Sequence, residues 1–341
     1  MLRFWLSWLV LLPSLAFAAP NGAQLFQQNC AVCHGEHGRG GVGVPLALPS
    51  FQSSVDNAYL AKTIRLGRPG RVMPAFPSLS DAEVNAIVHY VRSFTHVKPP
   101  EFSAAPVKGD VQQGAKLFAA NCASCHGDRG QGGAGTGVTF SRPRNLPIIP
   151  PALNNPGFQA AATDAQIRYT LIHGRQGTPM VSFRAKGLSD RQIDNIVAYV
   201  RTLKRGPVEE HENEPPMLVE ESSSSFEATI KSVRQAIIGA NFLMIREQSL
   251  DYGLVPKDKE NTREHILYFC NFPFLNKALG IDPRVGLFLP CRVTVVERQG
   301  KVYVMAINPL KLSHLFNNDE LNELCKHMHD VYRQVLDEAT L

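Results

Sequence analysis

Apolar residues recur at helical spacing in two similar stretches of the chain, residues 78–94 and 187–203. Each stretch carries a capping box, in which Ser80 or Ser189 is followed three positions later by Glu or Gln, so each predicts a helix that begins there. The apolar positions share one helix face. They are Val84, Ile87, Val88 and Val91 in the first stretch and Ile193, Ile196, Val197 and Val200 in the second.

The two stretches belong to an internal repeat. Residues 22–41 align without a gap to residues 114–133, where both copies predict an opening helix. The offset between the copies then grows from 92 to 107 residues, which locates a fifteen-residue insertion in the second copy. The insertion includes the proline-rich stretch 141–151, a loop by composition. Each copy therefore predicts an all-α domain of helices joined by long loops.

The last third of the chain has a different pattern. Apolar helical spacing predicts a helix over residues 226–239 and a closing helix near 318–338. Between them, β-branched and aromatic runs predict strands at residues 242–248, 265–271, 286–297 and 301–308. The last two strands are joined at Arg298-Gln299-Gly300, a hairpin signal. This region predicts a small α+β domain, so the whole chain is expected to be multidomain.

Residues 1–18 have the features of a secretory signal peptide: Arg3, an apolar run and the small-residue triplet Ala16-Phe17-Ala18. We expect cleavage before Ala19 and export to the periplasm. An uncleaved anchor is the alternative, but the apolar run is shorter than the roughly 20 residues of a membrane span. No later stretch is apolar enough to span a bilayer, so no transmembrane segment is expected after cleavage.

Composition shifts divide the exported chain. We expect a first domain at residues 19–97, a linker at 98–110 and a second domain at 111–205. An acidic, serine-rich linker follows at 206–225, and the α+β domain occupies 226–341. The net charge is +5, and the excess of basic residues lies in the two repeats. Basic domains can bind nucleic acid, but export and the chemistry of the repeated motif argue against that partner.

Each repeat carries the motif Cys-x-x-Cys-His. Two thiols at this spacing, with His directly after them, suit covalent attachment of haem through thioethers. Cys30, Cys33, Cys122 and Cys125 are therefore the predicted anchors of two haem c groups, with His34 and His126 as the axial ligands of iron. A zinc site or a thioredoxin-like redox pair would leave the repeated histidine unexplained.

The sixth iron ligand is expected from a loop before each closing helix. Met73 and Met180 lie 39 and 54 residues after their histidines, a difference equal to the insertion. His173 is the competing ligand in the second copy, and it would lower the potential of that haem. The carbonyls of Pro45 and Pro151 are the expected acceptors for the histidine Nδ1 hydrogens.

Residues 22–94 and 114–203 each resemble a class I cytochrome c of the bacterial periplasmic kind. The resemblance rests on Cys-x-x-Cys-His-Gly, the glycine-rich loop, the methionine loop and the Leu-Ser-Asp start of the closing helix. It implies an all-α fold around one haem per domain, His/Met ligation and one-electron transfer. The second copy reads Pro-Met-Val where the first reads Met-Pro-Ala, a departure at the ligand Met180.

Residues 226–341 resemble the domain of unknown function 302 family. The resemblance rests on the Phe-Cys-Asn turn at Cys270 and the Leu-Pro-Cys-Arg-Val strand at Cys291. It implies a small α+β fold that is often dimeric, so a homodimer through this domain is one expectation. Cys270 and Cys291 could form a disulfide, bind a metal or sit as adjacent thiols, and buried structural cysteines are the simplest interpretation. Cys325, Met328 and His329 share a face of the closing helix but fit a packed core better than a metal site.

Three functions remain open from the sequence. The first is an electron carrier between periplasmic redox proteins, with the last domain serving docking, dimerisation or regulation. The second is an oxidoreductase whose last domain binds a small molecule, such as a sulfur compound at Cys270 or Cys291, and feeds its electrons to the haems. The third is a haem-based redox or gas sensor. A six-coordinate iron leaves no vacancy for substrate, which favours the carrier, and the sequence names no catalytic residue.

Overall fold

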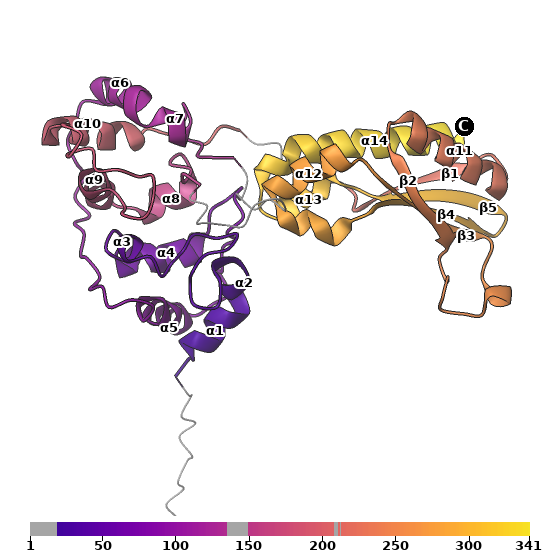
Figure 1. Cartoon of the computed structure of the whole chain (residues 1–341), viewed down its shortest axis with the longest axis horizontal. Coiled ribbons are helices and arrows are strands. Elements are labelled where there is room, and N and C mark those ends of the chain that lie inside the picture. The colour runs from indigo at the N-terminus through magenta and orange to yellow at the C-terminus, as the bar shows by residue number, and fades with distance from the viewer. Residues whose placement is uncertain (1–18, 135–148, 208–210, 212) are drawn as a thin grey trace, which may run out of the picture.

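The computed structural model describes residues 19–134, 149–207, 211 and 213–341. The predicted signal peptide and residues 141–148 of the proline-rich insertion lie outside the described residues. Figure 1 shows two small helical domains, one above the other, with an α+β domain beside them. We call these the first repeat domain, the second repeat domain and the C-terminal domain. Within the described part of the chain, no helix combines the length and apolarity needed to cross a bilayer.

The two repeat domains contain the same elements in the same order, as the repeat predicts. The first consists of α1 (Gly22–Asn29), α2 (Ala31–His34), α3 (Pro49–Gln52), α4 (Asn57–Leu66) and α5 (Asp81–Arg92). The second consists of α6 (Val111–Asn121), α7 (Ala123–His126), α8 (Pro156–Ala161), α9 (Asp164–His173) and α10 (Asp190–Val200).

The closing helices begin as the sequence predicts. In α5, the Ser80 backbone N–H donates to the Glu83 carboxylate at 2.7 Å while the Ser80 hydroxyl accepts from the Glu83 backbone. Ser189 and Gln192 form the same reciprocal pair at the start of α10. Both capping boxes are confirmed, and they satisfy backbone donors that a helix start would otherwise leave unpaired.

The opening helix of each repeat domain crosses its closing helix in direct backbone contact. A Cβ on Gly22 would lie 2.1 Å from the Ala86 carbonyl oxygen, and one on Gly114 would lie 2.0 Å from that of Asn195. Glycine is therefore required at both crossings. Aromatic pairs flank them, with ring centroids 5.5 Å apart for Phe26 and Tyr90 and 5.2 Å apart for Phe118 and Tyr199.

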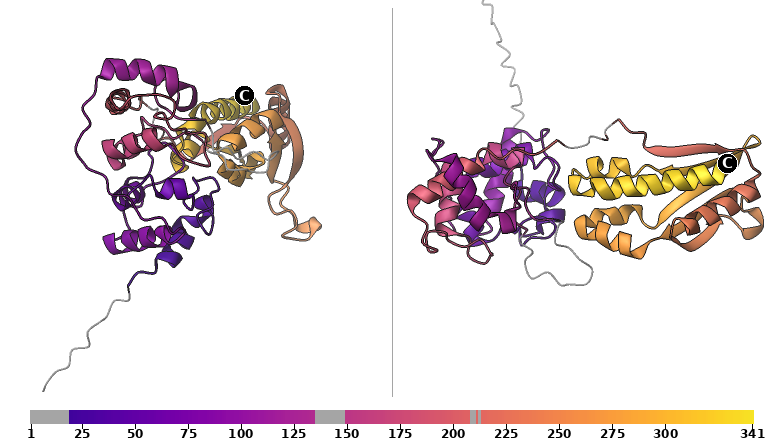
Figure 2. Two further views of the ribbon diagram at one scale, coloured as in Figure 1. Left: turned by 60° about the vertical axis from the view of Figure 1, so that its left-hand side comes forward. Right: turned by 90° about the horizontal axis from the view of Figure 1, so that it is seen from above.

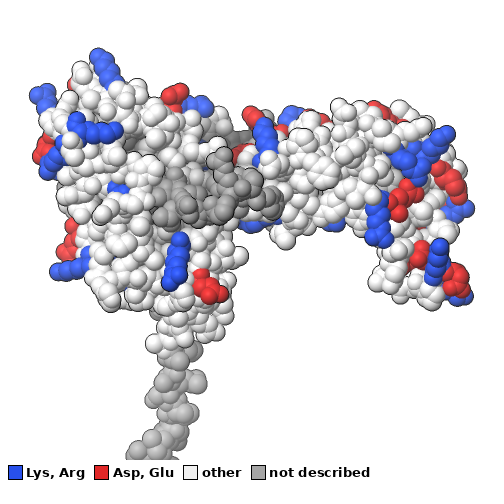
Figure 3. Space-filling model, in the orientation of Figure 1, with Lys and Arg blue, Asp and Glu red and all other residues white. Residues whose placement is uncertain are grey.

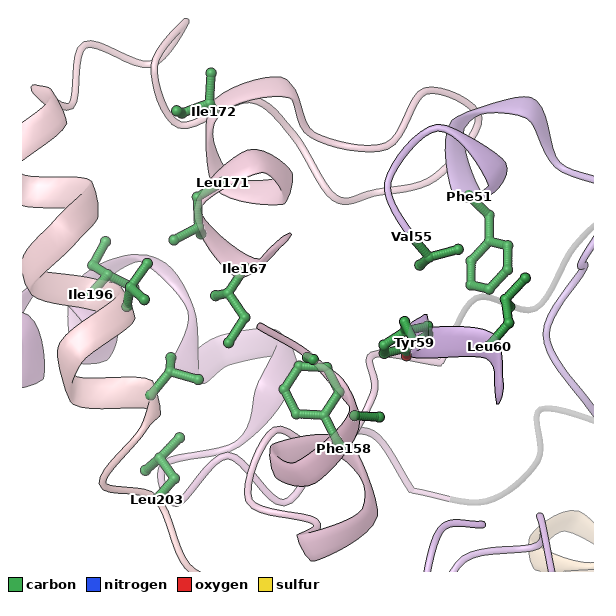
Figure 4. Close-up of a cluster of buried hydrophobic side chains, with 14 of the residues drawn as sticks. Phe51, Val55, Tyr59, Leu60, Phe158, Ile167, Leu171, Ile172, Ile196 and Leu203 are labelled. Carbon is green, nitrogen blue, oxygen red and sulfur yellow. The ribbon is translucent and has the colours of Figure 1, made fainter. Parts of the chain in front are cut away.

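The repeat domains share one hydrophobic core. Figure 4 shows Phe158 of α8 beside Tyr59 of α4, with the buried side chains of each domain continuing on either side. A hydrogen bond of 2.6 Å from the Ser50 hydroxyl to the Gln176 carbonyl also joins the two domains. The second repeat domain therefore packs on the first through a dry contact.

The C-terminal domain is a five-stranded antiparallel sheet in the order β1-β5-β4-β3-β2. Two long helices, α11 and α14, pack together on one sheet face (Figure 2). Shorter helices gather at the end that faces the repeat domains (Figure 1). The strands are β1 (Met217–Ser222), β2 (Leu243–Ser249), β3 (Glu264–Cys270), β4 (Cys291–Arg298) and β5 (Lys301–Ile307). The helices are α11 (Phe226–Gly239), α12 (Phe272–Ile281), α13 (Leu310–Leu315) and α14 (Asn322–Thr340), with 3₁₀ turns η1 (Lys257–Lys259), η2 (Pro283–Phe288) and η3 (Asp319–Leu321).

The structure differs from the sequence prediction in three places. Strand β1 lies inside the segment expected to be an acidic linker, because its pairing with β5 brings Leu218 into the core despite the surrounding glutamates. Strand β4 begins at Cys291 rather than at residue 286, since the preceding residues form η2 and Pro290 has no N–H for the ladder. Helices α12 and α13 are too short for a clear apolar period.

The β4–β5 hairpin is confirmed. Arg298 pairs with Lys301, which leaves Gln299 and Gly300 as the two turn residues. Their φ angles of 53° and 76° are those of a turn with both central residues in the left-handed region. This turn matches the right-handed twist of the strands, so a two-residue connection is sufficient.

Candidate haem-binding sites and the thiol-lined cavity

The Cys-x-x-Cys-His motif has the same backbone in both repeat domains. In the first, the Cys30 N–H bonds to the Phe26 carbonyl at 2.8 Å and the His34 N–H bonds to the Cys30 carbonyl at 2.9 Å. The equivalent bonds in the second are 2.8 Å from Cys122 to Phe118 and 2.8 Å from His126 to Cys122. One turn of chain therefore brings both thiols and the imidazole to the end of the opening helix.

Both motif histidines are oriented by a backbone carbonyl. Nδ1 of His34 lies 2.9 Å from the Val44 carbonyl oxygen, and Nδ1 of His126 lies 3.0 Å from that of Pro151. The contact of Pro151 is the one expected, whereas the expected Pro45 is replaced by Val44, because the first loop is shorter and turns one residue earlier. A carbonyl can only accept a hydrogen bond, so the proton sits on Nδ1 and Nε2 keeps the lone pair that a metal requires.

Burial favours the neutral form of these imidazoles. It lowers the pKa of His34, although the bond to Val44 acts in the opposite direction. Burial, with a smaller contribution from Arg175, also lowers the pKa of His126. A neutral imidazole is the form that binds a metal.

The glycine-rich loop leaves no room for a side chain beside His34. A Cβ on Gly43 would lie 2.7 Å from both Nδ1 and Cε1 of the imidazole. Gly35 and Gly40 have φ angles of 77° and 95°, which only glycine adopts readily. The loop therefore holds the imidazole in a close-fitting cradle of backbone.

The predicted methionine ligands occupy equivalent loops. The Arg68 N–H donates to the Met73 carbonyl at 2.9 Å, and the Arg175 N–H donates to the Met180 carbonyl at 2.7 Å. Each loop follows the helix that precedes it in the same way. The competing ligand His173 is exposed at the end of α9, where its ring lies 4.2 Å from that of Tyr169 between centroids.

One buried group lacks a partner that haem would supply. Nε of Arg175 is buried without a hydrogen-bond partner among the described residues. Its guanidinium carbon lies 5.5 Å from the ring centre of Phe51 in the other repeat domain, and burial lowers its pKa. A buried cation with an unused donor fits an anionic substituent such as a haem propionate. The cysteines, histidines and this arginine together fit the group that the motif implies.

Arg175 was not identified from the sequence, although a signal was present. The dipeptide Gly-Arg occurs at the same position of both repeats, at residues 67–68 and 174–175. In the first repeat domain, Arg68 is instead satisfied by the Tyr59 hydroxyl and by Thr63, each at 3.0 Å. The equivalent positions therefore differ in whether the arginine has a protein partner.

The three remaining cysteines line one cavity of the C-terminal domain. Cys270, Cys291 and Cys325 meet there with Met328 and Tyr332 around a volume of about 60 Å³. The thiols are not joined in disulfides. Burial raises the pKa of Cys291 to about 11 and that of Cys325 to about 12, so both are neutral thiols near pH 7.

The metal alternative for the closing helix finds no geometric support. Cys325 and Met328 are buried in the cavity wall, while Nδ1 of His329 turns away to the Asn308 side chain at 2.9 Å. Among the residues that the structure describes, no three His, Cys, Asp or Glu side chains are grouped to hold a metal ion. The cavity is therefore apolar and sulfur-lined.

Charged side chains do not gather into one large patch on the face shown in Figure 3. Basic and acidic residues alternate at the far end of the C-terminal domain, and the described part of the repeat domains carries scattered charges. This face offers no extended basic surface of the kind that binds a nucleic-acid backbone.

Comparison with known families agrees with this geometry. The model of the family "Cytochrome C oxidase, cbb3-type, subunit III" matches residues 17–91 and 109–200. The model "Domain of unknown function DUF302" matches residues 219–339. The chain joins cytochrome c domains to a DUF302 domain. Membership of the cytochrome c family implies covalently bound haem c, and the DUF302 match includes strand β1.

Curated relatives cover the cytochrome part. The cbb3-type cytochrome c oxidase subunit CcoP of Azospirillum sp. strain B510 is 30% identical over 206 residues, which are 56% of this chain and 64% of the relative. The cytochrome bc1 complex cytochrome c subunit of Mycobacterium leprae is 29% identical over 196 residues, 53% of this chain and 60% of the relative. The chain thus spans less than two thirds of the length of these relatives. A solved structure of an uncharacterized DUF302 protein from Bacillus stearothermophilus matches 36% of this chain and 98% of its own, with 22% identity and a TM-score of 0.34.

Proposed function

We propose that this protein is an exported di-haem cytochrome c that carries single electrons between redox partners in the bacterial periplasm. The observation that carries the proposal is the duplication of one site: His34 facing Val44 and His126 facing Pro151, each with a methionine loop of the same design. The bound haem supplies an iron that gains and loses one electron. The chain's residues attach that group, orient its ligands and exclude water from it.

The role of each residue follows from its place in the site. Cys30, Cys33, Cys122 and Cys125 form the thioethers, and His34 and His126 bind iron through Nε2. Met73 and Met180 supply the sixth ligands. For the second domain, Met180 is preferred to His173 because Met180 packs against the hydrophobic core. His173 is exposed and stacked on Tyr169 instead.

Spectra of two single variants test the ligand assignment. Met180→Ala is expected to remove the part of the Met-to-iron charge-transfer band that the second haem contributes, and to let that haem bind carbon monoxide when reduced. His173→Ala is expected to leave the band and the carbon monoxide reactivity unchanged. The reverse result would assign His173 as the ligand. A haem-to-chain ratio of one in the purified protein would contradict the di-haem proposal itself.

The proposed partners are components of respiratory chains. Support comes from the relatives, which are named as subunits of a cbb3-type oxidase and of a bc1 complex. Export is supported by the signal-peptide features of residues 1–18. Reduction by one purified complex and oxidation by another, measured by stopped-flow absorbance, would identify donor and acceptor.

We also propose that the C-terminal domain forms a homodimer. The outer edge strands of its sheet expose Met217, Val219, Leu243 and Ile245 on the side opposite the buried core. Exposed apolar groups of this kind commonly mark protein contacts. Light scattering of the purified protein should give twice the monomer mass, and Val219→Lys should restore the monomer; a monomeric wild type would contradict the dimer.

A second function is supported by the cavity. In this alternative the C-terminal domain binds a small reduced molecule, such as a sulfur compound, and the first repeat domain receives its electrons. Turn η2 lies between the two: Val285 and Phe288 line the cavity, while Asp282 and Arg284 are close enough to affect the pKa of Cys33, which burial mainly raises. The cavity wall and the predicted attachment site of the first haem are therefore neighbours.

Filling the cavity tests this alternative. If the cavity is a substrate site, reduction of the ferric protein by thiosulfate or sulfide should saturate with concentration, and Val285→Trp should abolish the saturation. Val32→Trp, at a position that is 85% exposed, is the matched control. Equal, non-saturating rates in all three proteins would refute a substrate role for the cavity.

A further inference from the structure

Asn317 of the C-terminal domain reaches into the loop that carries Met73. Its side-chain nitrogen lies 3.1 Å from the Arg68 carbonyl oxygen and 3.0 Å from that of Met73, and it also contacts the Arg71 carbonyl. Its side-chain oxygen accepts from the Gly70 N–H at 2.8 Å. One amide therefore closes the loop from residue 68 to residue 73, including the backbone of the predicted ligand.

The position of Asn317 is fixed by its own domain. It follows α13 with a φ angle of 49°, a conformation that asparagine tolerates better than most residues. The preceding Phe316 is buried against Leu312, Leu321 and Cys325. The guanidinium of Arg284 lies 4.6 Å from the centre of the Phe316 ring and donates to its carbonyl at 2.6 Å. The amide therefore enters the loop from a packed support.

Neighbouring charges strengthen the same contact. Asp319 pairs with Arg205 of the second repeat domain, and its N–H donates to the Gly70 carbonyl at 3.1 Å. Glu320 pairs with Arg71. Gly70 has a φ angle of 70°, and a Cβ there would lie 2.0 Å from the Asp319 carboxylate. The loop and turn η3 thus fit one another at backbone distance.

The loop that carries Met180 is held in another way. The Thr178 hydroxyl donates to the Arg175 carbonyl at 2.7 Å and accepts from the Met180 N–H at 3.1 Å. Ser50 of the first repeat domain bonds to the Gln176 carbonyl. This loop is therefore closed from within the cytochrome c domains, and the two methionine loops differ in their support.

We propose that Asn317 is a positioning residue through which the DUF302 domain holds Met73 on the first haem and so raises the potential of that haem selectively. The inference rests on the proposed ligation by Met73. Methionine ligation raises the potential of a c-type haem, and a closed loop keeps the thioether in place. Leu312 and Leu321, on either side of Asn317, also line the thiol-lined cavity. A molecule that enters the cavity would therefore act on the same segment that supports the Met73 loop.

The test uses the full-length holoprotein carrying Met180→Ala, so that the remaining Met-to-iron band reports on the first haem. Asn317→Gly removes the amide and accommodates the positive φ, and Asn317→Asp keeps the shape but replaces the donor with a carboxylate facing carbonyls. Both should shift the loop roughly tenfold toward its open form. The expected result is a weaker band, a lower midpoint potential of the first haem and binding of carbon monoxide.

Asn241→Gly is the matched control, because Asn241 also has a positive φ, of 67°, but lies at the turn between α11 and β2. It should change neither band nor potential. Unchanged band and potential in both Asn317 variants, with the band lost in Met73→Ala, would overturn the positioning role alone. A band that survives Met73→Ala would overturn the ligand assignment and this inference together.

Discussion

The guanidinium carbon of Arg175 lies 5.5 Å from the centre of the Phe51 ring, across the contact between the two cytochrome c domains. The arginine is buried, and its Nε has no protein partner among the described residues. A cation in this position stabilises negative charge on the second haem, and it disfavours the extra positive charge of ferric iron. The contact between the domains thus carries a group suited to tune one haem.

Arg175→Met should therefore lower the potential of the second haem. Loss of a buried cation favours the ferric state, and we expect a fall of about 59 mV, which is a tenfold change in the equilibrium of a one-electron couple. Spectroelectrochemical titration would measure it. Arg191→Met, at an exposed position of α10, is the control and should leave both potentials unchanged. A similar shift in both variants would show that net charge, not the buried site, is responsible.

The cysteines should separate into two chemical classes. Three of the seven cysteines should react with a maleimide in the denatured holoprotein, because the other four are thioethers in the proposed function. In the native protein these three should label slowly at pH 7, since burial raises the pKa of Cys291 to about 11 and that of Cys325 to about 12. Mass spectrometry counts the labels. Seven labels after denaturation would rule out covalent attachment.

Gly114→Ala should destabilise the second cytochrome c domain. The added Cβ would lie 2.0 Å from the Asn195 carbonyl oxygen, which is backbone of the facing helix and cannot move aside cheaply. We expect a loss of about 1–3 kcal/mol in the free energy of unfolding, the usual cost of overpacking. Denaturant unfolding followed by circular dichroism measures it. Gly239→Ala, where a Cβ meets nothing within 4 Å, should be close to neutral.

The C-terminal domain should lose stability in mild acid through His329. Burial lowers the pKa of this imidazole in the folded state, although Asp330 and Glu214 act against the shift, so the proton binds better to the unfolded chain. Its contribution is therefore present above the unfolded pKa of about 6.5 and is lost as pH falls. Unfolding at pH 7.5 and pH 5.5 should show a smaller acid loss in His329→Gln, which can still donate to Asn308. Equal pH dependence would exclude His329 as the cause.

Local signals in the chain predicted the elements that depend on near neighbours. The repeated glycine, the capping serines and the Cys-x-x-Cys-His turn each act within a few residues, so their structures follow from local geometry. The same holds for the Gln299-Gly300 hairpin. The His126 acceptor was predictable because Pro151 follows the repeat alignment, whereas the His34 acceptor shifted by one residue to Val44 with the shorter loop.

Strand β1 shows where local signals are insufficient. Its glutamates and the serines that follow it suggest a linker, but pairing with β5 buries Leu218 in a core supplied by residues far along the chain. A strand at a sheet edge is decided by its partner, and no local period states which partner that is. The same limit concealed the gathering of Cys270, Cys291 and Cys325 around one cavity.

The sequence by itself determined the chemistry of this protein: two attachment motifs, two candidate methionines and the family of each domain. These features are short and repeated, and covalent attachment demands particular residues at fixed spacing. Only the tertiary structure decided how the domains act on one another, through Arg175 over Phe51 and Asn317 in the Met73 loop. Such contacts join surfaces that are remote in sequence, and they form only where packing of whole domains brings a single donor to a single loop.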